Sequence, residues 1–79
     1  MKATVLVRPK SGILDPQGQA VETALEHLGF TVSGARVGKV IDLEVDASDA
    51  VTARAQVEKM CERLLANPLI ESYEIEVDG

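Results

Sequence analysis

The spacing of apolar residues changes several times along this chain, and those changes limit the possible folds more than any other feature. Residues 2–8 alternate between apolar and other side chains, a period of two that predicts a β-strand. Pro9 ends the strand, since proline has no N–H to donate to a sheet ladder. The side chains on the predicted buried face are Ala3, Val5 and Val7.

The spacing then becomes helical. Asp15 and Pro16 are typical of a helix start, with Asp15 as the N-cap and Pro16 in the first helical position. The predicted helix runs from Pro16 to about Leu28, where Gly29 is placed to end it in a left-handed conformation. Its apolar stripe consists of Val21, Ala24, Leu25 and Leu28.

A period of two returns between residues 31 and 46. Gly38 occupies the first of the two central positions in the stretch 37–40, which is typical of a type II′ hairpin turn. The pattern therefore predicts two strands joined at Gly38. The second strand would bury one face, formed by Ile41, Leu43 and Val45.

A second helix is predicted from a cap at Ser48 or Asp49 to about Leu65. Pro68 disfavours helical geometry at the residue before it, so the helix should stop there. A last strand is expected over about residues 69–77. The predicted helical stripe is Ala50, Ala53, Val57, Met60, Cys61 and Leu64, and the strand face is Tyr73, Ile75 and Val77.

These elements predict an α+β fold with the order strand, helix, strand, strand, helix, strand in one domain, residues 1–79. The simplest packing is a four-stranded, mostly antiparallel sheet with both helices on one face, the ferredoxin-like arrangement.

Size and charge restrict what such a domain does. Chains shorter than about 80 residues usually need a disulfide, a metal or a partner chain. One cysteine, Cys61, and one histidine, His27, provide neither a disulfide nor a Cys/His zinc site. Association with another chain is therefore expected.

The net charge of −5 disfavours nucleic acid and anionic membranes as partners. With no long apolar segment, we expect a cytoplasmic protein.

Catalytic chemistry finds little support in the residues. His27 lies near a helix end and off the apolar stripe, as expected for a surface histidine. Cys61 fits a buried, small apolar residue better than a catalytic thiol. The acidic residues of the strands fall on solvent faces, and no loop gathers them as a calcium site requires. We therefore expect no catalytic, cofactor or metal site.

The loop before the first helix is the strongest candidate for a binding surface. Helix N-termini bind anions, so a ligand contact is possible, and a loop that docks a partner protein fits equally well. Gly18 in the first helical turn is unfavourable for a helix and suggests close approach by another backbone. The candidate residues are Lys10, Gly12, Ile13, Leu14, Asp15, Gln17, Gly18, Arg36 and Lys39.

Two motifs resemble the PurS family. They are G-I-L-D-P-Q-G at residues 12–18 and L-L-A-N-P at residues 64–68, and the likeness extends over nearly the whole chain. Ala35 and Leu69 are mild departures, at positions where that family commonly has a larger aliphatic residue and valine. Further similar positions are Pro9, Lys10, Ala24, Leu25, Leu28, Gly29, Phe30, Arg36, Gly38, Lys39, Met60, Cys61, Ile70, Glu71 and Tyr73.

The resemblance implies a non-catalytic subunit of phosphoribosylformylglycinamidine (FGAM) synthase in purine biosynthesis. Such a chain forms a dimer or tetramer and bridges a synthetase subunit and a glutaminase subunit, supporting ammonia transfer. ATP and Mg²⁺ would be used by the synthetase subunit, and this chain would hold no cofactor.

Two alternatives share the expected topology. A regulatory domain that senses an amino acid or nucleotide would bind near a glycine between the first strand and the first helix, and Gly12 occupies that position. An RNA-binding domain is disfavoured by the negative charge, and because Phe30 and Tyr73 are the only aromatic residues.

Overall fold

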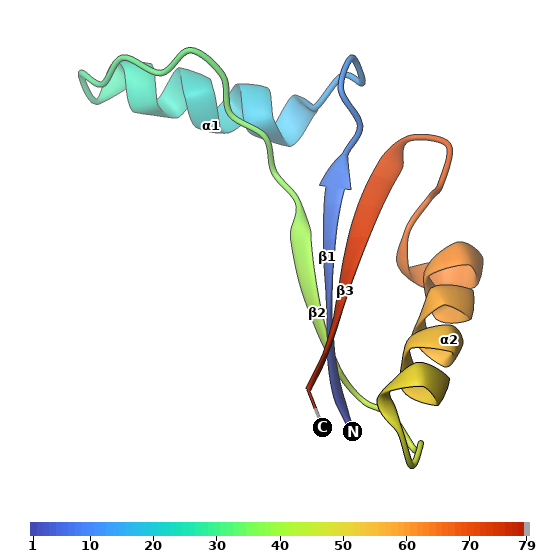
Figure 1. Cartoon of the computed structure of the whole chain (residues 1–79). Coiled ribbons are helices and arrows are strands. Elements are labelled where there is room, and N and C mark those ends of the chain that lie inside the picture. The colour runs from blue at the N-terminus through green and yellow to red at the C-terminus, as the bar shows by residue number, and fades with distance from the viewer. Residues whose placement is uncertain (79) are drawn as a thin grey trace.

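A computed structural model describes residues 1–78 as a three-stranded antiparallel sheet with one helix packed on it and a second helix projecting away (Figure 1). The strands are β1 (Lys2–Pro9), β2 (Lys39–Glu44) and β3 (Glu71–Asp78). Their order in the sheet is β2-β1-β3, so the N-terminal strand is central. The α+β class and the existence of the first and last strands were predicted correctly.

The register of the sheet places most of the apolar side chains of the three strands on one face. Val5 pairs with Ile41 on one side and with Ile75 on the other, and Ala3 pairs with Leu43 and Val77. The β1 residues on this face are buried, whereas those of β2 and β3 are partly buried. The opposite face carries the acidic side chains Asp42, Glu44, Glu74, Glu76 and Asp78.

Helix α2 (Ala50–Met60) covers the apolar face and closes the core. Asp49 caps it by accepting a 2.8 Å hydrogen bond from the Thr52 N–H, one of the two caps that the sequence suggested. The helix packs mainly against β3 and also against β1. The core residues are Ala3, Val5, Val7, Val45, Ala53, Val57, Cys61 and Ala66.

The second helix was predicted to continue to about Leu65, but α2 ends at Met60. Residues Cys61–Leu65 form a π-helical turn instead of continuing the α-helix. The widened turn keeps Cys61 buried but leaves Leu64 82% exposed, so Leu64 does not belong to the core stripe. The last strand starts at Glu71, two residues later than expected, because residues 68–70 form a turn.

Helix α1 (Pro16–His27) does not cover the sheet, contrary to the prediction of two helices on one face. It projects sideways from the end of β1, and residues 28–38 run back beside it to β2 (Figure 1). We call residues 10–38 the arm and the remainder the body. The molecule is correspondingly elongated, measuring 50 × 24 × 14 Å. Gly29 ends α1 at φ +94°, as expected.

The predicted fourth strand and its hairpin turn were wrong. Residues 31–38 form no strand, and β2 starts at Lys39. Gly38 has a different role from the one predicted, because a Cβ there would lie 2.2 Å from the carbonyl oxygen of Val7. Glycine therefore permits the close approach of this backbone to β1.

Among the described residues, no helix is long and apolar enough to cross a membrane.

Candidate functional site at the root of α1

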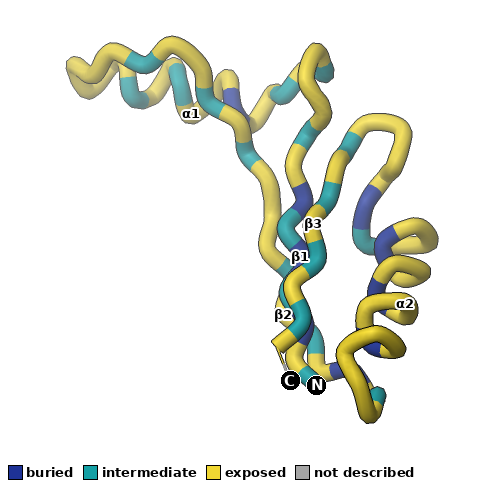
Figure 2. Tube along the Cα trace, in the orientation of Figure 1, coloured by how far each residue is buried: buried dark blue, intermediate teal, exposed yellow. Residues whose placement is uncertain are grey.

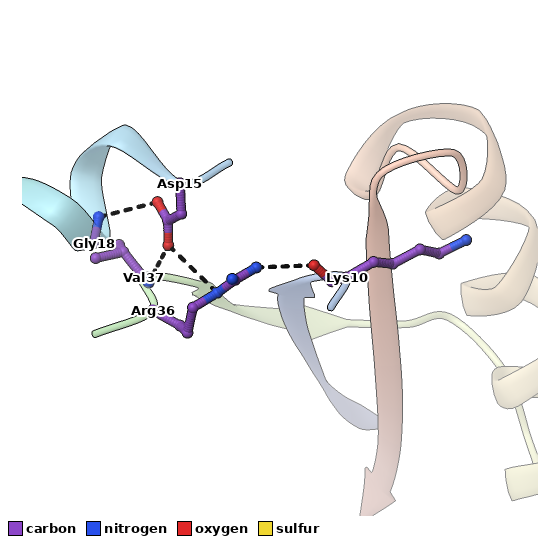
Figure 3. A network of polar contacts seen from close by, with 5 residues as sticks. All are labelled: Lys10, Asp15, Gly18, Arg36 and Val37. Atoms are coloured by element: carbon purple, nitrogen blue, oxygen red, sulfur yellow. Dashed lines mark hydrogen bonds and ion pairs between the residues drawn. The ribbon is translucent and has the colours of Figure 1, made fainter. Parts of the chain in front are cut away.

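We call the junction formed by Lys10, Asp15, Gly18, Arg36 and Val37 the root of α1 (Figure 3). The Asp15 carboxylate organises it by joining segments that are distant in sequence. One carboxylate oxygen accepts a hydrogen bond from the Gly18 N–H at 3.0 Å, the expected N-cap contact. The other accepts from the Val37 N–H at 2.8 Å. The side chain is only 11% exposed. Asp15 thus fixes the start of α1 to the segment that enters β2.

Arg36 strengthens the same junction. Its guanidinium donates to the Lys10 carbonyl oxygen at 2.8 Å, and its Nε lies 3.9 Å from the Asp15 carboxylate (Figure 3). This side chain is 46% exposed, so the ion pair by itself is weak. The carbonyl contact matters more for geometry, because it ties the end of β1 to the returning chain.

Gly18 brings α1 into close contact with residues 34–36 of the returning chain. A Cβ at this position would lie 2.2 Å from the Ala35 carbonyl oxygen and 2.7 Å from the Asp15 Oδ2 atom. The close backbone approach predicted for Gly18 is therefore confirmed, and the approaching backbone belongs to the chain itself. Any side chain here would push the helix away from residues 34–36.

Asp15 is ionised in this environment. Hydrogen bonds from the Val37 and Gly18 N–H groups hold the pKa of its carboxyl below the ordinary value of 3.8, and the Arg36 charge lowers it further against the opposing effect of burial. Asp15 also occupies the helix N-terminus at which an anion would bind, and Pro16 offers no N–H. The N-terminus of α1 therefore binds a carboxylate of the same chain in the place where an external anion would bind.

A surface hollow of about 410 Å³ lies between the root and the returning chain. Five of the predicted candidates line it, namely Gly12, Ile13, Leu14, Asp15 and Arg36. Lys10 and Gly18 belong to the adjoining network of Figure 3. Gln17 and Lys39 are exposed. The Gln17 backbone N–H also helps to lower the pKa of the Asp15 carboxyl.

The sequence did not reveal the rest of the site. Val37 and Ala35 take part through backbone atoms, which leave no signature in a side-chain pattern. Gln19 and Glu22 also line the hollow, one helical turn or more beyond the cap. In the sequence, only their spacing of three residues indicates that these two side chains lie on the same side of α1.

Comparison with known proteins decides the family. The model of the PurS family, described as phosphoribosylformylglycinamidine (FGAM) synthase, matches residues 2–79. This chain belongs to the PurS family. The PurS subunit of FGAM synthase from Methanocaldococcus jannaschii is 41% identical over 78 residues, which cover 98% of this chain and 94% of the relative. The resemblance drawn from the two motifs is confirmed.

Solved PurS structures have the same fold. Bacillus subtilis PurS is 42% identical and superimposes with a TM-score of 0.88 over 99% of this chain and 98% of its own. A chain in the structure of PurLQS from Thermotoga maritima is 41% identical, with a TM-score of 0.85 over 95% of this chain and 93% of that one. The projecting α1 is therefore compatible with the fold of these solved PurS structures.

Proposed function

We propose that this chain is the non-catalytic assembly subunit of an FGAM synthase complex. It associates with itself and bridges a synthetase subunit and a glutaminase subunit, so that ammonia released from glutamine reaches the synthetase. ATP and Mg²⁺ are used by the synthetase subunit. The observation that carries the proposal is the near full-length similarity to a chain in the Thermotoga maritima PurLQS structure.

The chemistry of the described residues supports an assembly role. Across residues 1–78, no group of three or more His, Cys, Asp or Glu side chains is placed to hold a metal ion. Cys61 is buried, and burial raises the pKa of its thiol, as do the nearby charges of Glu58 and Glu62. Asp15 is engaged in fixing the arm. These groups stabilise the subunit rather than provide a reactive centre.

The root of α1 is the surface we assign to the partner subunits. Asp15 and Arg36 pair with each other within the chain, whereas the Lys10 side chain points away from both (Figure 3). Leu14 is 70% exposed beside the hollow. A loop that is tied at both ends by hydrogen bonds and presents one cation and one large apolar side chain suits a protein partner.

Reconstitution tests the bridge. The purified chain is mixed with the synthetase and glutaminase subunits from its source, and ATP turnover on formylglycinamide ribonucleotide is measured with glutamine and, separately, with free ammonia. We expect the chain to be required with glutamine and much less with ammonia. Full glutamine-dependent activity in its absence would exclude the proposal.

Charge reversal locates the contact within that assay. Lys10→Glu is expected to lower glutamine-dependent turnover, whereas Lys59→Glu on α2 is the matched control and should leave it unchanged. Equal effects of the two variants would remove the root of α1 as the partner surface.

An amino-acid or nucleotide sensor remains the second candidate, because Gly12 lines the 410 Å³ hollow where such a ligand would sit. Calorimetry of the isolated chain against these ligands separates the two functions. Tight binding without partner proteins would favour sensing.

A further inference from the structure

The sheet order β2-β1-β3 makes β2 and β3 edge strands, each with one side that pairs with no other strand of the chain. Such an edge presents backbone N–H and C=O groups with which a strand of another chain can pair. Strand β3 is the longer of the two, with eight residues against six. Its Tyr73, Ile75 and Val77 side chains are only partly buried, and exposed residues alternate with them (Figure 2). An open β3 edge would therefore favour pairing that extends the sheet from chain to chain.

The register shows which backbone groups of β3 face outward. Lys10 lies opposite Ile70 in continuation of the β1–β3 register, and its N–H donates to the Ile70 carbonyl oxygen at 2.9 Å. Opposed residues of an antiparallel pair alternate between hydrogen-bonded and non-hydrogen-bonded positions, so every second residue from Ile70 onward directs its N–H and C=O toward β1. The residues between them direct these groups to the outer edge. They are Glu71, Tyr73, Ile75 and Val77.

A side chain of α2 occupies the middle of this outer edge. Helix α2 lies beside β3 with its buried positions turned toward the sheet (Figure 2). Arg54 follows the buried Ala53, and its Nη2 atom donates to the outward carbonyl oxygen of Ile75 at 2.9 Å. Within residues 1–78 this arginine forms no ion pair, so the Ile75 carbonyl is its polar partner. A charged donor makes a stronger hydrogen bond than the neutral N–H of an incoming strand.

The start of the same edge is also engaged. The outward N–H of Glu71 donates to the Asn67 carbonyl oxygen at 2.7 Å, within the turn that precedes β3. A hydrogen-bonded residue of an antiparallel pair uses both its N–H and its C=O, and Glu71 and Ile75 each have one of the two already engaged. Tyr73 and Val77 lie on either side of Ile75. A strand added to this edge therefore forms a continuous ladder only if it displaces Arg54.

We infer that Arg54 caps the outer edge of β3 and keeps the sheet from being extended by a strand of another chain. Covering an edge with a helix or a charged side chain is a common protection against edge-to-edge association. Here the protection depends on one exposed side chain, so a single substitution removes it while the core between α2 and the sheet stays in place. The cap acts in the isolated chain, whether or not the chain bridges two other subunits.

The onset of association tests the cap. Light scattering over a concentration series gives the concentration at which each protein grows beyond the mass of the dilute unaltered chain. We expect the onset for Arg54→Ala at about tenfold lower concentration, because strand addition no longer displaces a charge-assisted hydrogen bond. Arg54→Lys keeps a charged donor and should restore most of the difference. An Arg54→Ala protein with the onset of the unaltered chain would overturn the inference.

Two control variants separate loss of the cap from changes in charge and stability. Arg63→Ala, at an exposed position of the π-helical turn, makes the net charge of −5 more negative by the same amount, a change that opposes association. Val57→Ala weakens the core and leaves the edge unchanged. Both variants should keep the onset of the unaltered chain. An onset as early as that of Arg54→Ala in either control would attribute the effect to charge or to stability and exclude the cap.

Hydrogen exchange locates the association. Val45 exchanges two hydrogen bonds with Met1, so Asp42, which follows the opposite alternation, directs its N–H to the outer edge of β2. In associated Arg54→Ala, we expect the Tyr73 amide to become protected and the Asp42 amide to exchange as in the unaltered chain, as measured by quenched exchange and NMR. Protection of Asp42 in place of Tyr73 would assign the association to β2 and show that Arg54 does not cap the edge that pairs.

Discussion

The body and the arm use different interactions to hold their structure. In the body, α2 and the sheet enclose eight buried apolar residues. Between Lys10 and Gly38, the sole buried residue is Gly18, and the arm is held by backbone approach and by the hydrogen bonds of Asp15 and Arg36. Both helices carry apolar side chains at helical spacing, yet only α2 finds a partner surface within the chain. An amphipathic pattern therefore predicts burial without indicating which chain supplies the covering surface.

This contrast predicts unequal local stability. Apolar burial makes the body the cooperative unit, whereas a region with few buried contacts and exposed backbone hydrogen bonds opens at low cost. Substitutions in the body should therefore lower global stability, and substitutions in the arm should act locally.

The largest effect is expected from the core of the body. Val57→Ala should lower the free energy of unfolding by about 2 kcal/mol, because two buried carbons are lost and a cavity remains. Urea denaturation followed by circular dichroism measures the loss. Val51→Ala on the exposed side of α2 should stay within about 0.5 kcal/mol of the unaltered chain. Equal losses for the two variants would contradict the assigned faces of α2.

The next effect concerns the contact between α1 and the returning chain. Alanine is favoured over glycine in a helix by about 1 kcal/mol, so propensity alone predicts that Gly18→Ala stabilises α1. The clash with the Ala35 carbonyl opposes this, and overpacking typically costs about 1–3 kcal/mol. We expect faster hydrogen exchange in α1 and unchanged exchange in β1 and β3. Thr23→Ala, exposed on the same helix, controls for propensity, and slower exchange in Gly18→Ala would refute the close approach.

A smaller effect is expected from the Asp15 carboxylate. Its pKa is lowered in the folded chain, so its contribution is complete above the ordinary value of 3.8 and is lost as the pH falls through the lower, folded value. The Val37 amide resonance should therefore titrate in acid, as measured by NMR. Asp15→Asn offers one acceptor oxygen for two N–H donors and should abolish that titration.

Asp49 provides the matched control for Asp15. It caps α2 in the same way, and hydrogen bonds from the Thr52 backbone and side chain lower its pKa. Asp49→Asn should perturb the Thr52 amide and leave the Val37 titration intact. Loss of the Val37 titration in this variant would show that it does not report on Asp15.

The least disturbing test compares thiol reactivity in the two regions. Cys61 is fully buried, and burial raises the pKa of its thiol, so the native chain should react slowly with maleimide at pH 7. A cysteine in the arm, introduced as Thr23→Cys, should react rapidly. Labelling followed by mass spectrometry distinguishes the two sites. Rapid reaction of Cys61 in the native chain would mean that the body opens as easily as the arm.

The elements that depend on neighbours in sequence were largely predictable. The alternation in residues 2–8, the cap at Asp15 and the left-handed Gly29 all appear in the structure as expected. Residues 31–38 were predicted to form a strand because their apolar residues are spaced by two, which is the primary strand signal that a sequence gives. Pairing requires a second strand alongside, and local spacing carries no information about that.

The candidate site divides in the same way. Asp15 and Gly18 were recognisable, because a cap and a glycine in a first helical turn are local signals. Val37 and Ala35 contribute a backbone N–H and a carbonyl, which any residue would supply. Only the folded chain shows that these groups meet the root of α1.

The sequence by itself determined the fold class, most of the element ends and the PurS family, since helix caps, turns, periodicity and motifs are encoded by residues close together in the chain. The tertiary structure alone decided the number of paired strands and the direction of α1. Those depend on contacts across 20 residues or more, such as Asp15 with Val37 and Gly38 with Val7. One partner in each of these contacts is a backbone atom common to every residue, so the contacts become visible only when the chain is folded.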